Sequence, residues 1–309
     1  MKKIFNLIAS FVLLAGFSAC NKDGSDKPGL PPAPVPTVNY KGLTFISSGN
    51  STVCLAKVGA PDEITLEYST DESQWNPYTI GEKISLADGT FLLFRAGEQK
   101  NLTFSKGSDS YYHFEISGPV TAQGNIMSLL DRDFSTPLST NAFFALFEGC
   151  KSLLSAPELP ATTMAQGCYF RMFAECTGLK SAPELPAEAL AYNCYGRMFK
   201  GCSALTYVPD LPATKMEAYC YNSMFANCTS LKFAPELPAK RLESNCYHCM
   251  FEGCTSLTSA PELPATELVS NCYEFMYKDC RNLRYVIGLF TTEPSEKTTK
   301  DWLSGVAAS

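Results

Sequence analysis

The sequence feature that most limits the fold is a repeat of 26 residues, seen for example between Cys150 and Cys176. A fixed period of this length predicts a solenoid, because one unit cannot bury its own apolar face and must stack on its neighbours. A leucine series and a series of proline pairs have the same period. Two cysteine series follow it, Cys150, Cys176, Cys202, Cys228, Cys254 and Cys280, and Cys168, Cys194, Cys220, Cys246 and Cys272.

Each unit has two halves with different patterns. In one unit, residues 257–263 are short and bounded by prolines, which predicts an extended segment. Leu268, Cys272 and Met276 then recur at intervals of four residues, which predicts a short helix. The expected fold class is therefore α+β, a solenoid over residues 141–289 with one short strand and one short helix in each 26-residue coil.

The unit resembles the BspA-type leucine-rich-repeat family of bacterial surface proteins. The matching residues are Cys254, Leu257, Leu263, Pro264, Leu268 and the Met276-Tyr277 pair, with their equivalents in the units that start at Cys150, Cys176, Cys202 and Cys228. The resemblance covers roughly half of the chain and implies a leucine-rich-repeat solenoid. The strand departs from the family pattern, because Pro261 adds a residue that cannot donate a hydrogen bond in a sheet.

Acidic residues occupy one strand position in every unit. Strict alternation from Ala260 would turn Glu262 inward, whereas the cost of burying a carboxylate favours Leu263 inward with a kink at Pro261. Stacking brings these charges to about 5 Å, where repulsion is on the order of 3 kcal/mol per pair at an effective dielectric near 20. We interpret them as a solvated stripe, either inert or a surface for a cation or a basic partner. The acidic stripe is Glu158, Glu184, Asp210, Glu236 and Glu262.

The N-terminus has the pattern of an export signal. Two lysines precede an apolar run from Ile4 to Gly16, and small residues precede Cys20. Small residues directly before a cysteine resemble the bacterial lipobox. Residues 1–19 are therefore expected to be a lipoprotein signal peptide, with Cys20 lipidated and anchored in the outer membrane at the cell surface. The proline-rich residues 20–37 predict an extended linker.

Residues 38–124 contain short alternating runs separated by turn-prone stretches, which predicts a small all-β sandwich module of the immunoglobulin-like kind. Such modules serve both as binding domains and as spacers. Trp75 and Tyr78 are either a platform that stacks on a sugar or core residues of the sandwich.

Both ends of a solenoid need caps. Residues 125–140 are expected to cover the first coil. The period lapses after Leu289, so residues 290–309 are expected to form a C-terminal cap and tail in which Trp302 closes the other end.

The remaining chemistry of the sequence points away from catalysis. The two histidines, His113 and His248, lie in different segments, and no nucleophile elbow, phosphate-binding loop or HExxH motif occurs. Cys246, His248 and Cys249 suggest zinc, but no second ligand pair accompanies them. The ladder cysteines are interpreted as buried reduced thiols. We expect no enzyme activity, no cofactor and no metal; a hydrolase that uses carboxylates alone is the alternative.

The expected function is binding. A net charge of -6 disfavours a nucleic-acid partner. The resemblance implies an adhesin-like surface lipoprotein whose solenoid binds a host or bacterial macromolecule, in the first instance a protein. One alternative is a glycan-binding accessory protein of a nutrient-uptake system, in which residues 38–124 would be the binder. Another is a purely structural surface protein.

Overall fold

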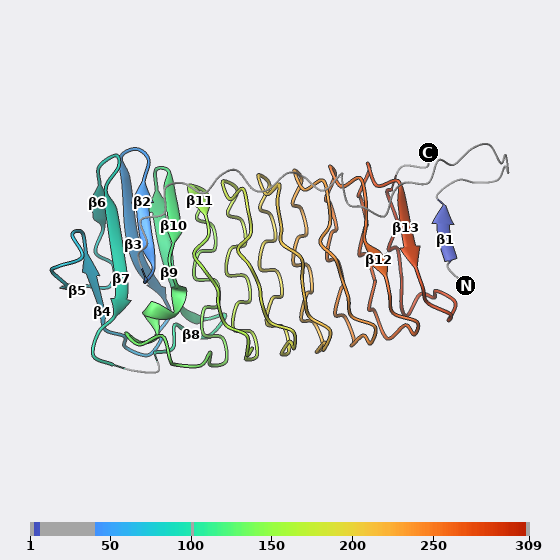
Figure 1. The fold of residues 1–309 in the computed structure, drawn as a ribbon, viewed down its shortest axis with the longest axis horizontal. Coiled ribbons are helices and arrows are strands. Elements are labelled where there is room, and N and C mark those ends of the chain that lie inside the picture. Colours follow the sequence, from blue (N-terminus) through green and yellow to red (C-terminus); the bar gives the residue numbers. More distant parts are fainter. Residues whose placement is uncertain (1–2, 7–40, 100–101, 307–309) are drawn as a thin grey trace.

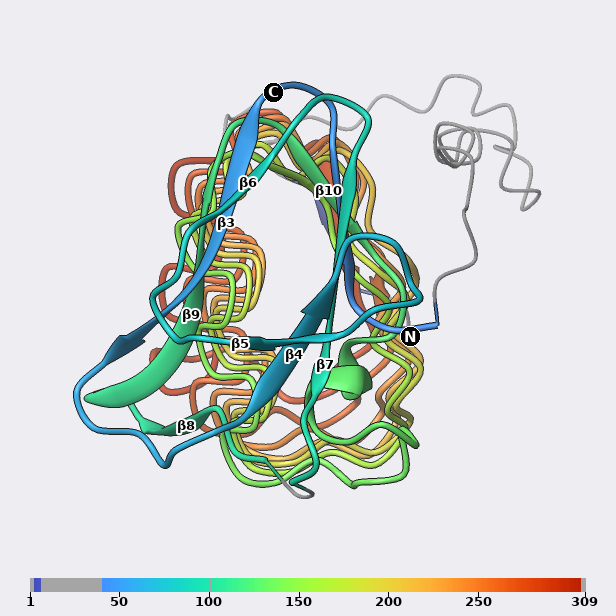
Figure 2. The ribbon, with the colours of Figure 1, turned by 90° about the vertical axis from the view of Figure 1, so that its left-hand side faces the viewer.

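The computed structural model describes residues 3–6, 41–99 and 102–306. It is an elongated rod in which a β module at one end continues into a stack of coils (Figure 1). Viewed along the rod, successive coils superpose and enclose one elongated core (Figure 2). Cys20, the linker and most of the expected signal peptide lie outside the described residues.

The module consists of two sheets whose apolar faces meet in the core. The first sheet has the order β11-β10-β2-β7-β4-β5 and the second has the order β6-β3-β9-β8. The first contains β2 (Thr44–Ser47), β4 (Leu66–Ser69), β5 (Asn76–Tyr78), β7 (Phe91–Ala96), β10 (Val120–Gln123) and β11 (Leu153–Ser155). The second contains β3 (Ser51–Val58), β6 (Ile84–Leu86), β8 (Ser105–Gly107) and β9 (Ser110–Ser117).

The module and the solenoid share one sheet and one core. Strand β10 pairs in parallel with β11, which belongs to the first coil. The backbone N–H of Phe114 donates to the carbonyl of Leu146 at 2.7 Å, and its ring stacks on Phe147 with centroids 5.1 Å apart. The module therefore covers the open end of the first coil. The 3₁₀ turn η1 (Ile126–Leu129) lies beside β7.

The expected α+β class is wrong, because the repeat segments predicted as helices are not helical. The described part of the chain has no α-helix, and hence no helix long and apolar enough to cross a membrane. In residues 167–176 the odd-numbered N–H groups donate to the next coil, as Tyr169 does to the carbonyl of Cys194 at 3.0 Å. The even-numbered ones donate three residues back, as Met172 does to Tyr169 at 3.2 Å. An α-helix would pair each N–H four residues back.

A left-handed backbone at every fourth residue causes this geometry. Gly167, Arg171 and Glu175 have φ of 59°, 57° and 60°, and the equivalent positions of the other coils repeat the pattern. A left-handed L-residue costs roughly 1–2 kcal/mol and cannot continue a right-handed helix. The interval of four between Cys272 and Met276 is thus the period of successive tight turns rather than that of a helix.

The proline half of each coil forms little regular sheet, as the missing proline donors predict. Besides β11, it contains β12 (Glu262–Leu263), β13 (Tyr285–Gly288) and isolated parallel bridges such as Ser181 with Tyr207. Strand β12 pairs in parallel with β13, and the short β1 (Lys3–Asn6) lies antiparallel to the other edge of β13 (Figure 1).

The core is a set of side-chain ladders along the rod. Phe173 stacks on Phe199 at 5.5 Å, and Tyr169 stacks on Tyr195 at 5.9 Å. The inward direction predicted for Leu263 is confirmed, and its equivalents face the core as well. These buried leucines are Leu159, Leu185, Leu211, Leu237 and Leu263.

The coil geometry continues past the sequence repeat. The N–H of Tyr277 donates to the carbonyl of Trp302 at 2.9 Å, so residues 295–306 form a further turn segment. The Trp302 ring packs against Tyr273 and Phe290, with centroids 6.3 and 6.0 Å away. This segment closes the far end of the core.

The phenylalanine ladder ends in one tyrosine, which gives a test of the packing. Tyr277 stacks on Phe251, and its buried hydroxyl has no hydrogen-bond partner among the described residues. An unsatisfied buried hydroxyl costs about 1–3 kcal/mol. Tyr277→Phe should therefore raise the free energy of unfolding by about 1 kcal/mol or more in denaturant titrations. The reciprocal Phe251→Tyr should lower it, and stabilisation by both changes would contradict the assigned packing.

Candidate binding sites

The acidic stripe faces solvent along the proline half of the coils. Glu158, Glu184, Asp210 and Glu236 are exposed, whereas Glu262 is half-buried where β12 meets β13. The coils thus bring the acidic residues into one row, and the leucine next to each acid anchors the row to the core. Asp210 also accepts a long hydrogen bond of 3.4 Å from the N–H of Glu236.

A shallow groove runs beside the first acids of the stripe. A cavity of about 340 Å³ lies between Pro157, Glu158 and Pro160 of one coil and Pro183 and Glu184 of the next. A second cavity, of about 310 Å³, lies against Glu188, Thr214 and Lys215. Pro186 lines both cavities, so they adjoin. We call this pair of cavities the proline groove.

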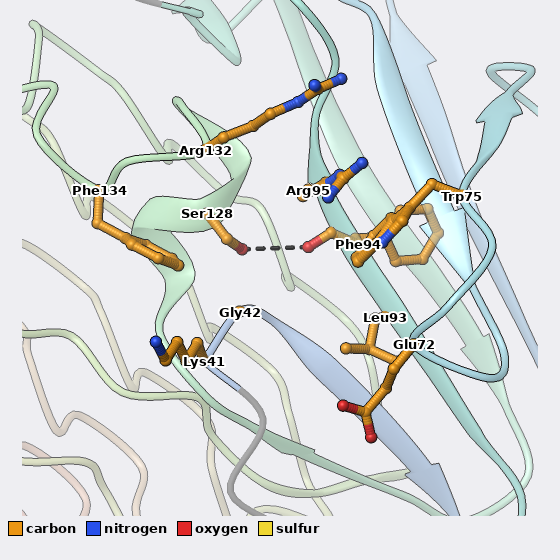
Figure 3. A pocket seen from close by; sticks show the side chains of 10 residues that line it. All are labelled: Lys41, Gly42, Glu72, Trp75, Leu93, Phe94, Arg95, Ser128, Arg132 and Phe134. Carbon is orange, nitrogen blue, oxygen red and sulfur yellow. Dashed lines mark hydrogen bonds between the residues drawn. The ribbon is translucent and has the colours of Figure 1, made fainter.

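A separate cavity of about 370 Å³ lies in the β module (Figure 3). We call it the module pocket. Trp75 and Phe134 stand on opposite sides of it, and Ser128 lies at its back, where its hydroxyl donates to the Phe94 carbonyl at 3.1 Å. Lys41 and Glu72 lie below this hydrogen bond in the view of Figure 3.

Two arginines at the module pocket share one carboxylate. Arg95 binds Glu67 at 2.7 Å, and Arg132 binds the other oxygen of Glu67 at 2.8 Å. The guanidinium of Arg95 also lies over the Trp75 ring, 3.7 Å from its centroid, in a cation–π contact. The network fixes both arginines at the cavity wall.

Two short loops that carry pocket residues are held by side-chain oxygens that accept backbone hydrogen bonds. In the first, Ser69 Oγ accepts from the N–H of Glu72 at 2.9 Å, and Asp71 Oδ1 accepts from Gln74 at 2.8 Å. In the second, the buried Asp131 accepts from Asp133 at 2.6 Å. Asp131 also accepts from the N–H groups of Ser135 and Thr136.

The hydrogen bonds of Asp131 have an electrostatic consequence. Burial raises the pKa of its carboxyl, but the hydrogen bonds from Thr136, Ser135 and Asp133 outweigh burial, and the pKa is lowered overall. A depressed pKa means that the carboxylate stabilises the fold above the unfolded value of about 3.9. This contribution is lost as the pH falls through the lower, folded pKa.

Asp131→Asn should loosen this loop. The amide replaces one accepting oxygen with a donor, which in either orientation faces a backbone N–H, that of Thr136 or those of Asp133 and Ser135. We expect a loss of about 1–3 kcal/mol in the free energy of unfolding at pH 7. Thermal melts from pH 7 to pH 3 should show a smaller loss of stability on acidification than in the wild type. Asp88→Asn, at an exposed turn, is the matched control. Equal pH profiles for Asp131→Asn and the wild type would contradict this role.

The ladder cysteines are core residues, and the first series also donates hydrogen bonds. Cys176 Sγ lies 3.0 Å from the carbonyl oxygen of Phe147, and the same contact recurs in the following coils. Burial raises the pKa of the thiols in both series, to about 12 for Cys150 of the first series and Cys168 of the second. They are protonated packing groups rather than nucleophiles.

The His248 neighbourhood does not form the zinc site considered from the sequence. Its Nδ1 lies 3.0 Å from the Asn222 amide, and its Nε2 lies 3.4 Å from Glu274 and 3.9 Å from Cys249 Sγ. Burial lowers the pKa of His248 and raises that of Cys249 to about 12. No group of three or more potential metal ligands occurs within the residues that the structure describes.

The sequence singled out only one residue of the module pocket. Trp75 lines it, but Tyr78 is a core residue whose hydroxyl accepts from the N–H of Leu55 at 2.8 Å. The two residues therefore do not form a sugar platform together. Arg95 comes from β7, whereas Arg132 and Phe134 belong to the turn at Asp131, and no spacing in the sequence marks this turn as a neighbour of β7.

Comparison with known proteins adds no identification. No family model, no curated protein and no solved structure matches the chain.

Proposed function

We propose that this protein is a non-enzymatic surface lipoprotein that binds an extended, basic segment of a protein partner along its solenoid. The observation that carries the proposal is the proline groove beside the acidic stripe. Proline, leucine and alanine side chains provide apolar contacts there, while Glu158 and Glu184 line the same cavity. An apolar groove with acids at its edge suits a ligand that combines an extended backbone with lysine or arginine side chains.

The coil architecture supports recognition by a preorganised surface. In the proline half, which carries the groove, the leucine next to each acid is buried in the core, and the backbone bonds to the next coil at points such as the N–H of Ala182 to the carbonyl of Tyr207 at 3.1 Å. Little ordering entropy is therefore lost when a ligand binds. The repeat also places equivalent acids on adjacent coils. Because neighbouring carboxylates repel each other, a cationic ligand that lies along the row relieves that repulsion.

Export and lipid anchoring of Cys20 belong to this proposal and rest on the N-terminal sequence pattern. Anchoring would place many copies on one surface. Several weak contacts with one partner would then add up through avidity.

The proposal predicts binding that depends on the stripe and on salt. Glu184→Gln, Asp210→Asn and Glu236→Gln, combined in one variant, should weaken binding to immobilised extracellular-matrix proteins at least tenfold in biolayer interferometry. Wild-type binding should itself weaken as salt rises from 50 to 500 mM, because exposed charges are screened.

A control variant carries the same change in charge at exposed acids outside the stripe, Glu175→Gln, Glu217→Gln and Glu243→Gln. It should bind like the wild type. Equal losses of binding in both triple variants would mean that net charge governs binding, rather than the stripe. Undiminished binding by the stripe variant would exclude the stripe as the contact surface.

A further inference from the structure

We propose that the module pocket is a second binding site, for a six-membered sugar ring that carries one carboxylate, such as a hexuronic acid residue. The site is independent of the protein binding proposed for the solenoid. Its volume of about 370 Å³ lies within the range of small-molecule sites.

Backbone strain points to this pocket. Most non-glycine residues with positive φ in the described ranges follow the 26-residue period. Outside that period there are two within those ranges, Glu72 with φ of 65° and Phe134 with φ of 57°. Both line the module pocket. Left-handed conformations of this kind cost of order 1–3 kcal/mol each and cluster at ligand sites, where the surroundings hold them.

Side-chain hydrogen bonds hold the two strained segments in place. Ser69 fixes the backbone of Glu72, and Asp131 fixes the turn in which Phe134 lies. Phe134 is half-buried at the rim and faces Trp75 across the cavity (Figure 3). The fold therefore maintains a strained turn that keeps an aromatic ring at the opening, where it can pack against the apolar face of a sugar ring.

The charges of the pocket define the ligand further. Lys41, Arg95 and Arg132 are cationic, whereas Glu72 at the wall and Glu67 behind it are anionic. The balance is one positive charge, which suits a ligand with one negative charge. The stacked Arg95 and the nearby Arg132 place this positive potential on one side of the cavity, and Glu72 lies on the other (Figure 3).

Glu72 distinguishes an acidic sugar from other anions. A carboxylate at the wall accepts hydrogen bonds, so the ligand has to present donors on the side opposite its own carboxylate. The hydroxyl groups of a hexuronic acid supply these donors. An aromatic carboxylate such as benzoate has none and makes no hydrogen bond to Glu72.

The test measures binding of glucuronate, galacturonate, glucose, galactose and benzoate to the full chain in detergent by titration calorimetry. Phe134→Gly is the main variant, because glycine adopts a positive φ without strain and the turn should stay folded. It should weaken uronate binding about tenfold or more, while the melting temperature changes little because relief of the backbone strain offsets the lost packing of the half-buried ring. Lys41→Gln should reduce the preference for uronates over neutral sugars, whereas Lys57→Gln, at an exposed position of β3, should not.

Each outcome decides the proposal. Uronate binding that is lost in Phe134→Gly and kept in Lys57→Gln supports it. Tighter binding of benzoate, equal affinity for neutral sugars, unchanged affinity in Phe134→Gly, or no binding of any sugar to the wild type would overturn it. The stripe variant of the solenoid should bind uronates normally, so failure at the pocket and failure at the stripe are distinguishable.

Discussion

The structure depends on the hydrogen bonds between coils. In each turn segment every second N–H donates to the neighbouring coil, and the others close tight turns within their own coil. This arrangement requires a left-handed residue at every fourth position, as at Arg197 and Gly201. Each coil therefore needs its neighbour to satisfy its backbone, and the module and residues 295–306 provide that neighbour at the two ends.

The side-chain ladders follow from this backbone. Because coils are related by a constant shift, identical residues stack, and aromatic rings lie parallel at 5 to 6 Å from one coil to the next. Cysteine suits the ladder position because it is small and apolar, and its S–H can donate to a phenylalanine carbonyl of the preceding coil. The repeated sequence and the repeated coil geometry therefore depend on each other.

Much of this was predictable from the sequence, and the failures have physical reasons. The 26-residue period predicted stacked coils, and burial cost correctly predicted Leu263 inward. The helix was wrong because an interval of four between apolar residues fits both a helix and a series of four-residue turns. Glycine, asparagine and aspartate favour left-handed positions, but the middle left-handed position of each turn segment holds residues that do not mark it, such as Arg171 and Phe275. The module pocket was missed because Arg95, Arg132 and Phe134 meet only through the sheet order and the turn at Asp131.

The most direct test of this account is the backbone conformation of one turn segment. Nuclear magnetic resonance of isotopically labelled protein gives Cα and Cβ chemical shifts for residues 193–202. The account predicts Cα and Cβ shifts of left-handed backbone at Asn193 and Arg197, and a left-handed Cα shift at Gly201. Three residues of other conformation separate each of these positions from the next. A continuous run of helical shifts across these ten residues would contradict it and restore a helix to each coil.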